Sequence, residues 1–180
     1  MDTRGSEHNL VAAAVVFITG TSGAGKTTLK KCLEELNSEF VRIHDFDELG
    51  VPENADSEWR RNATAQWVRY ALDNRGKGIH TIIIGQSVAS EIEHIVKEHD
   101  RSSIAYGFID IEDATIRERL AARHWSANLI AANVNWAKYL REDVSQQQNH
   151  TILEATSMLP GQVCDYFRSW IMEQIRRVSK

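Results

Sequence analysis

The sequence has few cysteines and no long hydrophobic run. Its two cysteines, Cys32 and Cys164, lie far apart and among apolar helical positions, which predicts reduced core thiols rather than a disulfide or a metal site. Reduced thiols fit a cytoplasmic location. The apolar stretch of residues 10–18 is nine residues long, which is too short to span a membrane. We therefore expect no membrane partner.

An excess of positive charge is also missing. The chain has 21 Lys and Arg against 25 Asp and Glu, a net charge of −4. Because nucleic-acid binding relies on clustered basic residues, this balance argues against nucleic acid as a partner and favours small soluble ones. No repeat, low-complexity tract or linker divides the 180 residues. We expect one domain with a flexible segment at residues 1–12, and the sequence gives no indication of the oligomeric state.

What the chain does contain is a P-loop motif. Residues 20–27 read Gly-Thr-Ser-Gly-Ala-Gly-Lys-Thr, which fits the pattern Gly-x-x-x-x-Gly-Lys-Thr. The apolar run 15–18 before it is typical of a buried strand, and residues 26–37 after it of a helix. A strand followed by this loop and a helix is the setting in which the motif binds nucleoside triphosphate.

Each part of the motif has a physical role. Loop N–H groups and the positive end of the helix dipole surround an anion, and glycines let the backbone approach it closely. Lys26 should reach the β- and γ-phosphates, and the Thr27 hydroxyl should bind Mg²⁺. We predict ATP and Mg²⁺ as cofactors, with the nucleotide bound by Gly20, Thr21, Ser22, Gly23, Ala24, Gly25, Lys26, Thr27 and Thr28.

Five β-like runs alternate with six helical patterns. This alternation predicts an α/β fold, a five-stranded parallel sheet with helices on both faces. In such sheets ligands bind beyond the carboxyl ends of the strands, so the residues after each strand are the candidates for chemistry. The expected strands are 15–19, 40–44, 79–84, 104–109 and 151–154, and the expected helices 26–37, 57–74, 88–99, 114–124, 134–148 and 160–178.

Two aspartates follow the second expected strand. Asp45 could hold Mg²⁺ through water, while Asp47 could orient and deprotonate an attacking hydroxyl. The alternative is that both merely cap a turn. Gln86, after the third strand, can donate and accept hydrogen bonds, which suits contact with a polar acceptor as well as a turn. Arg60 could grip a phosphate or carboxylate on that acceptor, or could be an exposed arginine of an amphipathic helix.

The fourth expected strand is followed by an arginine-rich helix. Arg119 and Arg123 are four residues apart, so both could project from one helix face toward a single polyphosphate and stabilise its transition state. A solvated charged face is the alternative. Asp110, at the end of the strand itself, could instead serve as the metal-binding acid of an ATPase.

Together these residues resemble the nucleoside-monophosphate-kinase-like group of P-loop kinases, which includes adenylate, shikimate and gluconate kinases. Residues 44–52 are also similar to bacterial P-loop proteins described only as ATPases or kinases. The resemblance implies a three-layer α/β/α fold with a short lid at about residues 124–133. It implies that Asp45 is the carboxylate on the magnesium side and Asp47 the one on the acceptor side. It also implies Arg119 near the adenine, Arg123 near the phosphates, and residues 154–157 near the adenine.

The leading hypothesis is an ATP-dependent kinase that transfers the γ-phosphoryl group to a hydroxyl or phosphate of a small molecule. Its catalytic residues would be Lys26, Asp47, Arg119 and Arg123, with the acceptor near Asp47, Arg60 and Gln86. The alternative is an ATP-binding switch or ATPase without a small-molecule acceptor. A regulatory GTPase is disfavoured, because the chain has no Asn-Lys-x-Asp segment for guanine recognition.

Overall fold

The computed structural model describes residues 12–180 and contains one parallel sheet of five strands. The predicted flexible segment 1–12 lies almost wholly outside these residues. The strand order is β2-β3-β1-β4-β5, which places the P-loop strand at the centre. The α/β fold with five parallel strands is therefore confirmed. The strands are β1 (Val15–Thr19), β2 (Val41–Asp45), β3 (His80–Ile84), β4 (Ile104–Asp110) and β5 (His150–Glu154).

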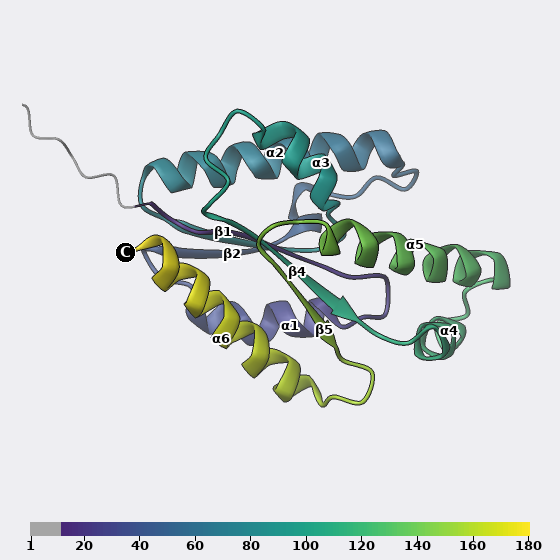
Figure 1. The fold of residues 1–180 in the computed structure, drawn as a ribbon. Helices are drawn as coiled ribbons and strands as arrows, with labels where there is room; N and C mark the ends of the chain where they lie inside the picture. Colours follow the sequence, from purple (N-terminus) through teal and green to yellow (C-terminus); the bar gives the residue numbers. More distant parts are fainter. Residues whose placement is uncertain (1–11) are drawn as a thin grey trace, which may run out of the picture.

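Helices cover both faces of the sheet (Figure 1). Helices α2 and α3 and most of α5 lie on one face, α1 and α6 lie on the other, and α4 lies beyond the carboxyl end of the sheet. The resulting arrangement has three layers. The helices are α1 (Lys26–Leu33), α2 (Ser57–Gly76), α3 (Ala89–Val96), α4 (Asp113–Ala121), α5 (Ala127–Ser145) and α6 (Pro160–Val178), with short 3-10 helices η1 (Glu34–Leu36) and η2 (Phe46–Leu49).

The central strands β1, β3 and β4 are buried along almost their whole length, which explains their largely apolar sequences. Alternate residues of β3 belong to different hydrophobic clusters: Ile82 and Ile84 pack in the cluster that contains α1 and α6, and Ile83 packs with α2 and α3. This is the period-two pattern of a strand between two layers. Gly107 in β4 makes room for α6, since a Cβ there would lie 2.9 Å from the ring of Phe167.

Helix α5 begins earlier than the sequence pattern predicted. Its first residue is Ala127, where residue 134 was expected, because the Ser126 hydroxyl accepts a hydrogen bond from the Leu129 N–H and caps the helix. Seven of the ten residues predicted as a lid loop, 127–133, are therefore helical. Helix α4 ends at Ala121, so the connection to α5 is only residues 122–126.

The prediction of two separate reduced thiols is wrong. Cys32 and Cys164 are paired as a disulfide, with their Cα atoms 6.2 Å apart. The two cysteines are far apart in sequence, but α1 and α6 pack side by side on one face of the sheet and bring them together. The argument for a cytoplasmic location from free thiols is lost with it.

Within residues 12–180, every helix falls short of the combined length and apolar character that a membrane span requires.

Candidate active site

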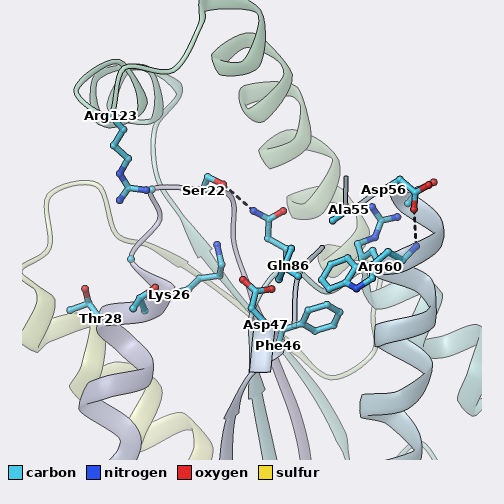
Figure 2. Close-up of a pocket in the computed structure, with 16 residues that line it drawn as sticks. Ser22, Lys26, Thr28, Phe46, Asp47, Ala55, Asp56, Arg60, Gln86 and Arg123 are labelled. Atoms are coloured by element: carbon cyan, nitrogen blue, oxygen red, sulfur yellow. Dashed lines mark hydrogen bonds between the residues drawn. The ribbon is translucent and has the colours of Figure 1, made fainter. Parts of the chain in front are cut away.

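A cavity of about 610 Å³ opens at the carboxyl edge of the sheet, between the P-loop and the segment that joins β2 to α2 (Figure 2). This size is typical of small-molecule sites. The cavity brings together residues from four separate parts of the chain. Its lining residues are Ser22, Gly23, Gly25, Lys26, Thr27, Thr28, Phe46, Asp47, Val51, Ala55, Asp56, Ser57, Trp59, Arg60, Gln86 and Arg123.

The P-loop has the backbone that an anion cradle needs. Gly23 and Gly25 have φ angles of 83° and 101°, a region that side chains with a Cβ rarely adopt. The Lys26 ammonium donates hydrogen bonds to the carbonyl oxygens of Gly20 and Thr21, both at 2.8 Å. Its charge is thus held at the loop, where a triphosphate would bind.

The environment of Lys26 changes its acidity. Burial lowers the pKa of the Lys26 ammonium to about 8, and the nearby carboxylates of Asp47 and Asp45 only partly offset this effect. An anion bound at the loop would favour the charged form and raise the pKa again. Lys26 is therefore a group whose protonation should be coupled to phosphate binding.

Asp47 is held in the cavity by the short helix η2. The Asp45 carboxylate accepts a hydrogen bond from the Asp47 N–H at 3.0 Å, and Glu48 accepts one from the Asp45 N–H at 2.9 Å, which together form a capping box. The Trp67 indole N–H donates to the buried carbonyl of Phe46 at 2.9 Å. Since Phe46 and Asp47 are adjacent, these contacts fix the backbone position from which the Asp47 side chain extends.

Gly85 at the end of β3 is also needed for this arrangement. A Cβ at Gly85 would lie 2.1 Å from the Cβ of Phe46, closer than any two such atoms can approach. Only glycine lets η2 pack against the end of β3.

The Asp47 carboxyl is tuned toward accepting a proton. Burial raises its pKa, the neighbouring Asp45 raises it further, and Lys26 opposes both effects. A carboxylate with a raised pKa is a stronger base than an ordinary aspartate. One carboxylate oxygen of Asp45 accepts the hydrogen bond that caps η2, as the turn-capping alternative predicted. Asp45 is not among the residues that line the cavity.

The donor set fits a magnesium ion bound mainly by phosphate and water. Thr27 and Asp47 line the same cavity, with Asp45 close by, and these are hydroxyl and carboxylate oxygens of the kind Mg²⁺ prefers. Among residues 12–180 no cluster of three or more His, Cys, Asp or Glu forms a closed metal site. A P-loop magnesium does not need one, because the nucleotide supplies ligands of its own.

Gln86 connects β3 to the P-loop. Its side-chain amide donates to the Ser22 hydroxyl at 3.1 Å (Figure 2). The side chain therefore lies between the P-loop and the part of the cavity lined by η2 and α2. Its predicted contact with a substrate stays a prediction.

Arg60 lines the cavity from α2, but its charge is already paired. Its guanidinium donates two hydrogen bonds to the Glu91 carboxylate of α3, at 2.7 and 3.4 Å, and lies over the Trp136 ring, 5.0 Å from the centroid. The two charged side chains are each only 21% exposed. Neither partner is close in sequence, so no local pattern indicated this arrangement.

Arg119 and Arg123 do not share a helix face, contrary to the sequence prediction. Helix α4 ends at Ala121, so Arg123 belongs to the connection after it. Arg123 lines the larger cavity, whereas Arg119 donates to the Gly23 carbonyl at 2.8 Å and lines a second cavity of about 220 Å³. The two arginines still lie on either side of one loop.

The second cavity adjoins the first. Both are lined by Gly25 and Thr28, so a single elongated ligand could pass from one to the other over the start of α1. The second cavity is the more apolar, as expected for a nucleobase, and it includes Ala155 of the segment 154–157 that was expected near the adenine. Its remaining lining residues are Ala24, Leu29, Arg119, Ala155, Met158, Pro160 and Val163.

Asp110, the alternative metal-binding acid, is held by an arginine. Arg141 of α5 donates to both Asp110 carboxylate oxygens, at 2.7 and 2.5 Å. This bidentate pair ties α5 to the end of β4 and occupies the carboxylate that an ATPase would use for metal.

Comparison with known proteins places this site in a family. A family model described as an AAA domain matches residues 16–150. The chain belongs to this AAA-domain family. The match begins in the P-loop strand and ends at the start of β5.

Relatives of this AAA domain carry kinase names. A protein of Pyrococcus furiosus named "Putative adenylate kinase" is 25% identical over 171 residues, covering 91% of this chain and 87% of the relative. A sugar kinase structure from Janibacter sp. HTCC2649 superposes with a TM-score of 0.69 at 18% identity, covering 93% of this chain and 98% of the other. A gluconokinase from Sinorhizobium meliloti 1021 gives 0.61 at 14% identity, covering 93% and 96%. The resemblance to P-loop kinases and the kinase-like fold are thus confirmed.

Several lining residues of this AAA domain were not predicted from sequence. Asp56 is the N-cap of α2 and accepts hydrogen bonds from the N–H groups of Glu58 and Trp59. An aspartate directly before Ser57, where the helix was expected to start, was a usable signal. Glu91, which pairs with the lining residue Arg60, gave no signal in the sequence, because only the packing of α2 against α3 brings the two together.

Proposed function

We propose that the protein is an ATP-dependent kinase that transfers the γ-phosphoryl group of ATP to a small-molecule acceptor. One observation carries this proposal: the phosphate-binding loop and the proton-accepting carboxylate of Asp47 line the same cavity, with open space between the loop and α2. The kinase names of relatives and structural neighbours support it.

The two adjoining cavities fit the two ends of ATP. The nucleobase would occupy the smaller cavity beside Arg119 and Ala155, and the triphosphate would pass over Gly25 and Thr28 into the larger one. The acceptor would then lie beyond the γ-phosphate, against Asp47, Gln86 and Arg60. This placement brings ATP and the acceptor into contact with the P-loop, the segment between β2 and α2, and Gln86.

Phosphoryl transfer would follow from this placement. The acceptor oxygen attacks the γ-phosphorus in line, the bond to the bridging β–γ oxygen breaks, and ADP leaves. Asp47 takes the proton of an acceptor hydroxyl, while Lys26 and Arg123 stabilise the negative charge of the transition state. Arg119 binds the nucleotide and, through the Gly23 carbonyl, fixes the loop.

Mg²⁺, held by Thr27 and through water by Asp45, would neutralise charge on the β- and γ-phosphates. The residues of this chain orient that complex and keep water from the γ-phosphate.

An ATPase without an acceptor is the weaker candidate. Its metal-binding acid would be Asp110, and the bidentate pair with Arg141 leaves that carboxylate little capacity to bind metal. The acceptor end of the cavity would also have no purpose in a simple ATPase. A cytoplasmic location remains part of the proposal, since ATP is abundant there.

The decisive experiment is ATP consumption measured with a panel of nucleosides, nucleotides, sugar acids and hydroxylated antibiotics. A signal that depends on one acceptor class supports a kinase. Lys26→Ala serves as the control and should lose nearly all activity while remaining folded, because the lysine supplies several kcal/mol of transition-state stabilisation. Equal ATP hydrolysis with and without every compound would instead favour the ATPase.

A further inference from the structure

Among residues 12–180, the acceptor end of the larger cavity is lined by one cationic side chain, and that side chain is already paired with a carboxylate. Three cationic side chains line the cavity: Lys26, Arg60 and Arg123. Lys26 belongs to the P-loop and Arg123 to the connection after α4, so both stand on the side of the donor phosphates (Figure 2). Arg60 of α2 is the cation on the acceptor side.

Arg60 is neutralised from behind. Glu91 accepts its two hydrogen bonds, and both side chains are largely shielded from water. In such surroundings an ion pair is strongly coupled, and drawing the guanidinium toward another anion would leave the Glu91 carboxylate buried without its partner. The Arg60 guanidinium can therefore contact the acceptor, but because it is paired with Glu91 it contributes little net positive charge.

Of the other polar side chains at this end, Gln86 and Ser57 are neutral and two are negative. Asp47 and Asp56 both line the cavity, and the Asp56 carboxylate caps the start of α2 by accepting hydrogen bonds from two backbone N–H groups. An acceptor phosphate or carboxylate would be repelled by Asp47, and it would find the positive end of the α2 dipole already neutralised by Asp56. Hydroxyl and ammonium groups, in contrast, can donate hydrogen bonds to them. The apolar side chains of Phe46, Val51 and Trp59 complete the wall and suit the carbon face of a ring.

We infer that the Arg60–Glu91 pair sets the acceptor class of the proposed kinase, so that the site takes an uncharged or cationic polyhydroxy compound rather than an anion such as a nucleoside monophosphate or a sugar acid. Glu91 is then a specificity-determining residue that acts through Arg60. This inference rests on the proposed kinase function and narrows it. It also separates this chain from its relatives whose name refers to adenylate kinase.

Diadenosine pentaphosphate tests the inference because it links two adenosines through five phosphates and can therefore fill an ATP site and an AMP site at once. An enzyme with a site for AMP should bind it far more tightly than ATP. We expect the wild-type protein to bind it within about threefold of ATP, since only the ATP half finds a site. Calorimetric titration gives both dissociation constants. The wild type should also form no ADP from AMP above the background with ATP alone.

Glu91→Gln frees the charge of Arg60 and should tighten diadenosine pentaphosphate by roughly fivefold or more while leaving ATP affinity unchanged. Glu93→Gln is the matched control. It removes a carboxylate from the same helix, but Glu93 pairs with Arg101 and Tyr106 away from the cavity. The control should bind both ligands like the wild type.

The outcomes are distinguishable. Diadenosine pentaphosphate binding more than about tenfold tighter than ATP in the wild type, or AMP-dependent ADP formation, would overturn the inference and leave the kinase standing. So would equal behaviour of the Glu91 and Glu93 variants, or an acceptor panel in which only anionic compounds raise ATP consumption. Absence of ATP binding to the wild type would overturn the proposed function itself.

Discussion

At the scale of single residues, the site depends on two ionisable groups whose acidity is shifted in opposite senses. Lys26 is easier to deprotonate than an ordinary lysine, and Asp47 is harder to deprotonate than an ordinary aspartate. Burial is the largest cause in both cases. The two shifts bring a cation for phosphate and a base for the acceptor closer to neutral pH.

Nucleotide affinity should therefore depend on pH. With the pKa of Lys26 at about 8, the ammonium is charged below that pH and already suited to phosphate. Above pH 8 binding must take up a proton, so the dissociation constant for ATP should rise by up to roughly tenfold per pH unit. Titrations between pH 7.5 and 9.5 measure this. Lys26→Arg keeps its charge throughout and should show no such rise; a flat wild-type profile would contradict the assignment.

Asp45 and Asp47 should be separable by mutation. Asp47→Asn should leave ATP affinity close to wild type but lower acceptor-dependent transfer by roughly 10²- to 10⁴-fold, because the base is lost. Asp45→Asn should weaken Mg²⁺-dependent nucleotide use with or without acceptor, and asparagine keeps the oxygen that caps η2. ATP affinity and turnover of both variants are the measurements. Full transfer activity in Asp47→Asn would end its assignment as the base.

At the scale of elements, the site is held by the packing of η2 against the end of β3. Gly85→Ala should displace Phe46, cost about 1–3 kcal/mol in the free energy of unfolding, and reduce transfer because Asp47 moves with it. Gly76→Ala is the control, since a Cβ there meets nothing within 4 Å. The control should be neutral or slightly stabilising in urea unfolding. Equal stability of the two variants would refute this role of Gly85.

The connection from α4 to α5 should respond to nucleotide. It carries Arg123 into the cavity, and the Thr21 hydroxyl of the P-loop lies 3.2 Å from two oxygen atoms of Asn133. We expect a non-hydrolysable ATP analogue to slow hydrogen exchange in residues 122–133, as closure excludes water from the phosphates. Helix α3 serves as the internal reference. Exchange in residues 122–133 that does not change with the analogue would contradict the lid predicted from the sequence.

Sequence reasoning located the strands well and the side-chain pairings poorly. Each strand was predicted to within one residue at either end. The central strands β1, β3 and β4 gave the clearest signal, because they are short, buried and largely apolar. The start of α5 was missed because its first turns are mostly exposed and give no apolar period. The Arg60–Glu91 and Arg141–Asp110 pairs were missed because each joins residues 31 positions apart, which no local pattern connects.

At the scale of the whole molecule, the Cys32–Cys164 disulfide links the P-loop helix to the last helix across a sequence separation of 132. Closing so long a loop restricts the unfolded chain, so its reduction should lower the free energy of unfolding by about 2–4 kcal/mol. Thermal unfolding with and without a reductant measures the loss. The Cys32→Ala, Cys164→Ala double variant should not respond to reductant, and a wild type equally indifferent would exclude a stabilising disulfide.

The central position of β1 constrains how the chain is made. Strand β1, the earliest strand within residues 12–180, lies between β3 and β4, so its second edge stays open until Asp110 has been synthesised. Until then the nascent chain presents an apolar strand with unpaired backbone groups, which favours aggregation. The P-loop also lacks Arg123 at that stage. Nucleotide binding therefore cannot assist the early steps of folding, and the nascent chain should depend on chaperones until most of the sheet is present.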